Sequence, residues 1–172
     1  MQPLRKWTVP VPKVNLVVGM GEMLVSNDVN STLLTYSLGS CVAVVIYDPS
    51  AKVGGLLHAM LPDSAFGSER AAEKPLMFID TGLPALFHAV YALGGSKSRL
   101  IVKLAGGASV LNESKFLNVA QRNIEAVKAL LARNGVRIDA EDIGGTDIRT
   151  VRLELATGSV QLDVTGKGSR KL

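Results

Sequence analysis

The chain has 172 residues, 47% hydrophobic and 20% charged, values that fit one folded domain and exclude a disordered chain or a coiled coil. No apolar run reaches the roughly 18 residues of a membrane-spanning helix, so no membrane insertion is expected. Residues 1–13 and 166–172 each carry +3, which leaves −2 of the total +4 for residues 14–165. We therefore expect a flexible basic N-terminal extension (1–13), one domain (14–165) and a flexible basic tail (166–172), without nucleic-acid binding.

The composition also limits cofactor chemistry. The only cysteine, Cys41, cannot form an internal disulfide, and one cysteine with two histidines does not supply the ligands of a structural zinc site. The N-terminus is basic, but neither an apolar segment nor a small-residue cleavage site follows, so no secretory signal is expected. We predict a cytoplasmic protein without a metal or other cofactor.

The first half of the domain is predicted to consist of strands. The strands are expected where residues alternate in polarity or are continuously apolar, at 13–19, 31–38, 42–47 and 53–61. The last two form a hairpin, because Asp48-Pro49 between them is typical of a turn. The polar segment 62–75, rich in small residues, predicts a mobile loop.

The second half mixes helices with strands. One helix is expected from Asp80 or Thr81 to Leu93. A second begins near Asn118, which with Gln121 resembles a capping box. Further strands are expected at 99–105, 150–156 and 159–164. The prediction is an α+β fold, with layered mixed or antiparallel β-sheets flanked by about two main helices.

The hairpin predicts that Cys41 and His58 share one face of the sheet. If Pro49-Ser50 is a two-residue turn, the two lie directly opposite each other. A four-residue loop, Pro49–Lys52, instead makes Ala43 the direct partner of the histidine and the cysteine its diagonal neighbour. Because side chains alternate with period two, both registers place the thiol and the imidazole together, about 5 Å or about 7–8 Å apart. A shift of one residue would separate them.

A thiol beside an imidazole suits acyl transfer. A free thiol has a pKa of about 8.5, and a neighbouring imidazole can take its proton. Backbone N–H groups at the Gly39-Ser40 turn before Cys41 can face a developing oxyanion. Taken singly, the cysteine and His58 are also typical of small or satisfied core residues. His88, in the first predicted helix, has no acid–base partner in the sequence pattern.

A third group would orient the imidazole, as in a catalytic triad. Asp48 and Asp63 flank the hairpin, but a turn or loop role explains each. Thr35 and Ser37 share one face of the preceding strand, and either can line the Cys41 face. Periodicity does not choose between them.

At this point the motifs match a known family. The segment Thr35–Val44, Thr-Tyr-Ser-Leu-Gly-Ser-Cys-Val-Ala-Val, resembles the active-site strand of the CheD chemoreceptor glutamine deamidases. His58-Ala59-Met60-Leu61-Pro62 follows seventeen residues after the cysteine, with the spacing of that family. Further similar segments are 103–108, 118–123, 142–145 and the turn 157–158, so the likeness covers residues 14–164. The chain departs from the family pattern at 144–149 and at Ala120.

The resemblance implies specific roles. Cys41 would be the nucleophile, His58 its base and Thr35 the third member, which selects Thr35 over Ser37. It implies a layered fold similar to the catalytic domain of the cytotoxic necrotizing toxins. The implied activity is that of a protein-glutamine glutaminase, a hydrolase that deamidates glutamines on the cytoplasmic helices of chemoreceptors through a thioester and needs no cofactor.

Several expectations accompany this assignment. The oxyanion and active-site loops are expected at Gly39, Ser40, Gly106 and Gly107. Hydrolysis of glutamyl methyl esters is a second activity open to the same thiol. Some members of the family bind the phosphatase CheC, a further candidate partner. The alternatives are a non-catalytic adaptor that regulates such a phosphatase, and a thiol protease or transglutaminase.

Overall fold

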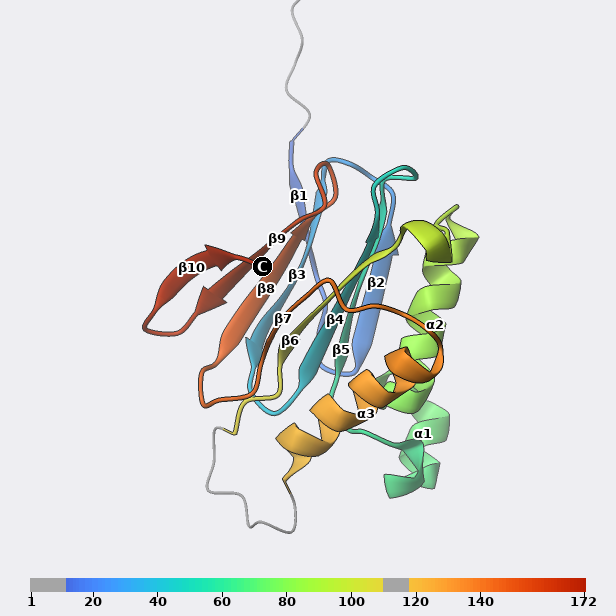
Figure 1. The fold of residues 1–172 in the computed structure, drawn as a ribbon, viewed down its shortest axis with the longest axis vertical. Helices are drawn as coiled ribbons and strands as arrows, with labels where there is room; N and C mark the ends of the chain where they lie inside the picture. Colours follow the sequence, from blue (N-terminus) through green and yellow to red (C-terminus); the bar gives the residue numbers. More distant parts are fainter. Residues whose placement is uncertain (1–11, 110–117) are drawn as a thin grey trace, which may run out of the picture.

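The computed structural model describes residues 12–109 and 118–172, which form two five-stranded sheets (Figure 1). The first sheet has the order β1 (Val14–Val17), β3 (Ser31–Leu38), β8 (Arg149–Glu154), β9 (Ser159–Val164) and β10 (Gly168–Lys171). The second has the order β2 (Glu22–Ser26), β5 (Val53–Ala59), β4 (Val42–Asp48), β6 (Ile101–Gly106) and β7 (Ala140–Ile143). The pairs β1–β3 and β6–β7 are parallel and the other pairs are antiparallel. The predicted layered, mixed sheets are therefore confirmed.

Two long helices cover one face of the second sheet. They are α2 (Ile79–Ala92) and α3 (Val119–Arg133), and they form the outer layer in Figure 1. Their apolar stripes pack against β4, β5 and β6 in one core cluster. The sequence predicted about two main helices, and α2 and α3 are these two. No helix within residues 12–109 and 118–172 has both the length and the apolar content to cross a membrane.

The second sheet is the middle layer, which explains the continuous apolar sequence of β4. Val42, Val44 and Ile46 face the helices, whereas Ala43, Val45 and Tyr47 face the first sheet. All seven residues of β4 and of β5 are buried. A strand that is covered on both faces has no position for an exposed polar side chain. Any polar group on β5 is therefore held in a dry interlayer space.

The structure differs from the prediction in the short elements between β5 and α2 and in the loop after α2. The segment 62–75, expected to be a mobile loop, contains a 3-10 turn (Ser64–Phe66) and the helix α1 (Ser68–Glu73). Neither Asp80 nor Thr81 caps α2, whose N-cap is Phe78. Asp80 instead accepts hydrogen bonds from the backbone N–H and the hydroxyl of Ser64. Two more 3-10 turns lie at Pro75–Met77 and Lys97–Arg99.

The C-terminal residues form a strand in place of the expected flexible tail. β10 pairs antiparallel with β9, and Arg170 forms an ion pair with Asp142. Lys167 forms an ion pair with Asp147, so two of the basic residues at this end of the chain have acidic partners on the domain itself. The short strands β2 and β7 were likewise not predicted. Most of the expected N-terminal extension lies outside the described residues, and within it Lys13 forms an ion pair with Glu154.

Candidate active site

The β4–β5 register places the cysteine and the histidine on one face. Ala43 is paired with His58, and Asp48 with Val53, so the connection is the four-residue loop Pro49–Lys52. Of the two predicted registers, the one in which Cys41 is the diagonal neighbour of the histidine is confirmed. The histidine is 1% exposed and the cysteine is half-buried. Cys41 packs against the core cluster between the two sheets, and Ala43, the pairing partner of His58, belongs to the same cluster.

The backbone of His58 is held on both sides. β5 lies between β2 and β4, and the residue is paired with Glu22 on one side and Ala43 on the other. Its carbonyl also accepts a hydrogen bond from the Gly21 N–H. The imidazole therefore projects from a rigid central strand, which is the kind of support that a positioned catalytic group needs.

Thr35, on β3 of the first sheet, meets the imidazole across the interlayer space. Its Oγ1 lies 2.7 Å from His58 Nδ1 and 2.7 Å from the Val18 carbonyl oxygen, and the residue is fully buried. A hydroxyl carries one proton, which it donates to the carbonyl, so it accepts a hydrogen bond from Nδ1–H. This assigns the neutral tautomer that leaves a lone pair on Nε2. Nε2 is buried and has no hydrogen-bond partner within the described part of the chain.

The other candidates for a third member have different surroundings. Ser37 is exposed and has a positive φ of 55°, at the irregularity that β3 shows between Thr35 and Leu38 in its pairing with β8. Asp48 accepts hydrogen bonds from the turn amides at Ser50 and Ala51 and pairs with Arg99. Asp63 accepts from the Ala65 N–H at the start of a 3-10 turn. Of the four predicted candidates, the hydroxyl of Thr35 is the one placed against the histidine.

Burial controls the protonation of the pair. It lowers the pKa of His58 to about 4. It raises the pKa of the Cys41 thiol, an effect that the cysteine's own backbone N–H partly opposes. Charged forms are penalised in a dry interlayer space, so each group favours its neutral state. In the free protein at neutral pH the pair is a thiol and a neutral imidazole.

The segment that carries the cysteine is held by the end of β6. The Gly107 N–H donates to the Cys41 carbonyl and the Ala108 N–H donates to the Gly39 carbonyl, both at 2.7 Å. Gly106 has a φ of 106°, and a Cβ atom there would lie 2.3 Å from the Cys41 carbonyl oxygen. Only glycine allows this close approach of two backbones. The predicted loop glycines thus lie directly against the cysteine backbone.

Sequence reasoning missed one buried polar residue beside this segment. Asn123 of α3 is 0% exposed, and its side chain contacts the turn before Cys41. The available signal was an amide on the helix face that otherwise carries Ala120, Ile124 and Val127. A polar residue within an apolar stripe needs internal hydrogen bonds, which the linear pattern does not identify.

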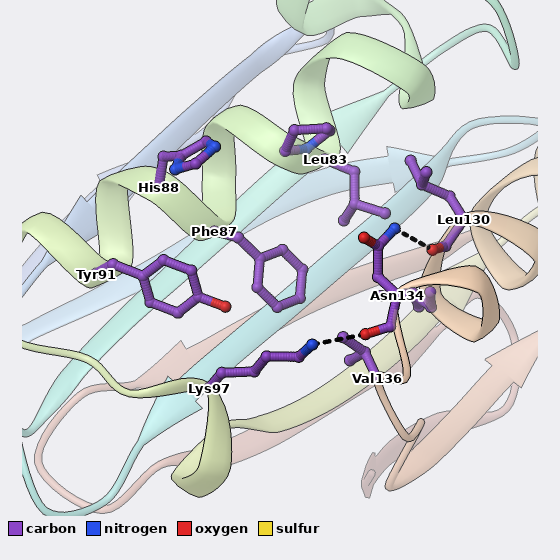
Figure 2. A pocket seen from close by; sticks show the side chains of 10 residues that line it. Leu83, Phe87, His88, Tyr91, Lys97, Leu130, Asn134 and Val136 are labelled. Carbon is purple, nitrogen blue, oxygen red and sulfur yellow. Dashed lines mark hydrogen bonds between the residues drawn. The ribbon is translucent and has the colours of Figure 1, made fainter.

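A separate apolar cavity lies between α2 and α3. It has a volume of about 300 Å³, and its lining includes Leu83, Phe87 and Leu130 (Figure 2). The Lys97 ammonium donates to the Asn134 carbonyl at its edge. His88 is exposed at this cavity, with its ring edge-on to Tyr91, and lies on a different element from the Cys41 site. Throughout residues 12–109 and 118–172, no group of three or more His, Cys, Asp and Glu side chains is placed to hold a metal ion.

Comparison with known proteins identifies the family. A sequence profile described as CheD chemotactic sensory transduction matches residues 60–164. A relative from Syntrophus aciditrophicus is 48% identical over 158 residues, covering 92% of this chain and 99% of its own. Relatives from Desulforamulus reducens (47% identity, 87% of this chain, 90% of its own) and Pyrococcus horikoshii (42%, 88% and 93%) are similar as well. All three carry the name probable chemoreceptor glutamine deamidase CheD.

The structural comparison is much weaker. The crystal structure of Neisseria meningitidis protein NMB0706, of the family DUF152, aligns with a TM-score of 0.39 and 9% identity. The alignment covers 76% of this chain and 62% of that protein. The similarity to the cytotoxic necrotizing toxins stays a prediction. The sequence relatives and the profile carry the assignment: the chain belongs to the CheD family.

Proposed function

We propose that the chain is a chemoreceptor glutamine deamidase in which Cys41 is the nucleophile, His58 the base and Thr35 the residue that orients the base. One observation carries this proposal. The Thr35 hydroxyl holds Nδ1 of the imidazole at 2.7 Å and leaves Nε2 buried with no partner among the described residues, on the face of the hairpin that carries the thiol. The names of the relatives supply the substrate class.

The proposed reaction is acyl transfer through a thioester. Nε2 of His58 accepts the thiol proton as Sγ of Cys41 attacks the carboxamide carbon of a glutamine. The backbone N–H of the cysteine faces the tetrahedral oxyanion. The imidazolium then gives its proton to the departing ammonia. A water molecule, deprotonated by the same imidazole, hydrolyses the thioester, so that glutamine and water yield glutamate and ammonia.

The pKa shifts determine when the thiolate forms. With a raised thiol pKa and an imidazole pKa of about 4, proton transfer is unfavourable in the free enzyme. Proton transfer therefore accompanies attack on the bound carboxamide. The imidazolium is short-lived because its partner at Nδ1 is a neutral hydroxyl and not a carboxylate. A low imidazolium pKa favours delivery of the proton to ammonia, the leaving group of the reaction.

The test is conversion of glutamine to glutamate in a purified chemoreceptor cytoplasmic fragment, measured by peptide mass spectrometry. The parent should convert specific glutamines, and Cys41→Ala and His58→Ala should not. His88→Ala is the matched control, because it removes the other histidine from an exposed position and should retain the parent rate. Absence of conversion by the parent across several receptors would contradict the proposal and favour the adaptor function.

The same intermediate extends the proposal to esters. A glutamyl methyl ester and a glutamine side chain pass through the same kind of tetrahedral adduct, so methylated receptor should release methanol in a reaction that Cys41→Ala abolishes. Binding to a CheC-type phosphatase is a separate prediction. It should survive Cys41→Ala, because that change removes a sulfur atom and leaves the surface shape almost unchanged.

A further inference from the structure

Asn123 is a fully buried polar side chain on the inner face of α3. Its neighbours on that face, Ala120, Ile124 and Val127, are apolar and buried. An amide buried in such surroundings is costly unless it is hydrogen-bonded. Its contacts therefore indicate what the residue contributes.

The amide bridges the ends of the two strands that carry the proposed nucleophile and base. Nδ2 donates to the carbonyl oxygens of Ser40 and Met60, each at 2.9 Å. Two carbonyl acceptors require the NH₂ group at this position, which fixes the orientation of the amide. Ser40 directly precedes Cys41, and Met60 lies two residues after His58. The amide thus joins the strand ends just beyond the last β4–β5 pair.

The bond to Ser40 also sets the direction of the next N–H group. In a trans peptide the C=O and the N–H point in opposite directions, and the described residues contain no cis peptide. With the Ser40 carbonyl turned towards Asn123, the Cys41 N–H is turned away from α3. A hydrogen bond from that N–H lowers the pKa of the Cys41 thiol, against the larger effect of burial. An oxyanion formed by attack of this sulfur develops beside the same N–H.

We propose that Asn123 is a positioning residue for deamidation: by holding the Ser40 carbonyl, it aims the Cys41 N–H at the oxyanion. The inference rests on the proposed function, since it assumes acyl transfer at Cys41. Among the described residues, the hydrogen bonds of the Asn123 side chain go to these two backbone carbonyls, and its Oδ1 is buried without a partner there. Its removal lets the Ser40–Cys41 peptide rotate, and the oxyanion then loses a pre-aligned donor.

Two reactions of the same thiol separate this role from a structural one. Alkylation by iodoacetamide is a displacement at carbon that forms no oxyanion, whereas deamidation requires one. Asn123→Ala removes both donors, and Asn123→Leu removes them while roughly keeping the side-chain volume. Val127→Ala is the matched control, because Val127 lies one turn further along the same buried face of α3. Folding of each variant is checked by circular dichroism and thermal unfolding.

In both Asn123 variants we expect kcat for receptor deamidation to fall by about 10- to 100-fold, short of the full loss of an oxyanion donor. The KM should stay within about twofold of the parent, because the oxyanion does not enter it, and so should the limiting alkylation rate of the fully formed thiolate, which does not depend on the thiol pKa that this N–H lowers. Val127→Ala should leave all three quantities near the parent values, even where it lowers the thermal midpoint.

Four outcomes would overturn the inference or the proposal beneath it. Alkylation and deamidation that fall together would make Asn123 a support of the Cys41–His58 pair and not of the oxyanion. Unchanged deamidation in a folded variant would remove its role altogether. Failure of both variants to fold, while Val127→Ala folds, would make it a residue of the fold alone. A parent enzyme that deamidates no receptor would contradict the proposed function itself.

Discussion

Replacing Thr35 with valine removes a buried hydroxyl and keeps the shape of the side chain. The hydroxyl makes two hydrogen bonds of 2.7 Å, one to the Val18 carbonyl and one from the imidazole of His58. Without it, both the carbonyl and the Nδ1–H group are left unpaired in a site where Thr35 is 0% exposed and His58 is 1% exposed. The substitution therefore affects stability and catalysis by separate routes.

The magnitudes follow from these two bonds. Each unsatisfied buried group costs about 1–3 kcal/mol, and the apolar valine offsets part of this, so we expect a loss of about 2–4 kcal/mol in the free energy of unfolding. For catalysis, the imidazole loses the acceptor that keeps the proton on Nδ1. A histidine that carries its proton on Nε2 cannot accept the thiol proton there. A neutral hydroxyl controls the tautomer less strongly than a carboxylate, so we expect kcat to fall about 100-fold.

The assay is receptor deamidation under saturating substrate, with thermal unfolding measured on the same preparations. Thr35→Ser should recover most of the activity, because it restores the hydroxyl. Ser37→Ala removes an exposed hydroxyl from the same strand and should behave like the parent. If folded Thr35→Val keeps kcat within about threefold of the parent, the tautomer does not depend on this hydroxyl, and our account of the site is wrong.

Three further predictions concern the same site. Burial raises the pKa of the Cys41 thiol, so its alkylation rate should still be rising above pH 9; a rate independent of pH from about 6 to 9 would instead indicate a preformed thiolate. Burial lowers the pKa of His58 from 6.5 to about 4, so the unfolded chain binds the proton first as the pH falls. The free energy of unfolding, measured in urea, should therefore fall by about 3 kcal/mol between pH 6.5 and pH 4. In His58→Gln the free energy of unfolding should fall less over the same range. Gly106→Ala should abolish deamidation and cost about 2 kcal/mol or more, because its Cβ would meet the Cys41 carbonyl oxygen at a positive φ. Gly166→Ala, also at a positive φ (74°) but with no atom within 4 Å of the added carbon, is the control for backbone strain without a clash.

Local patterns in the sequence determined much of the fold. The alternating segment 31–38 and the apolar segment 42–47 are strands with nearly the predicted bounds. α3 begins after Asn118, whose side chain accepts a hydrogen bond from the Gln121 N–H as the capping pattern predicts. These features depend on residues close together in the chain, so the sequence alone carries their signal. The short edge strands β2 and β7 depend on partners distant in the chain and were not predicted, whereas β10 was missed although its partner, β9, directly precedes it.

The pairing of Cys41 with His58 was determined by the sequence up to the choice between two registers. The structure decides for the four-residue loop, in which Asp48 accepts hydrogen bonds from the Ser50 and Ala51 amides. Both turn lengths are compatible with the local sequence. The register is therefore decided by how the whole hairpin packs between α2 and the first sheet.

Other features of the site were decided by tertiary structure alone. Thr35 and Ser37 are equivalent by strand period, and only the irregularity of β3 opposite β8 separates them, leaving one hydroxyl buried against the imidazole and the other in solvent. Asn123 is more than sixty residues from both carbonyls that it bridges. A sequence can therefore name a nucleophile and a base from local motifs. The groups that orient them come from separate layers, and their contacts exist only after those layers pack.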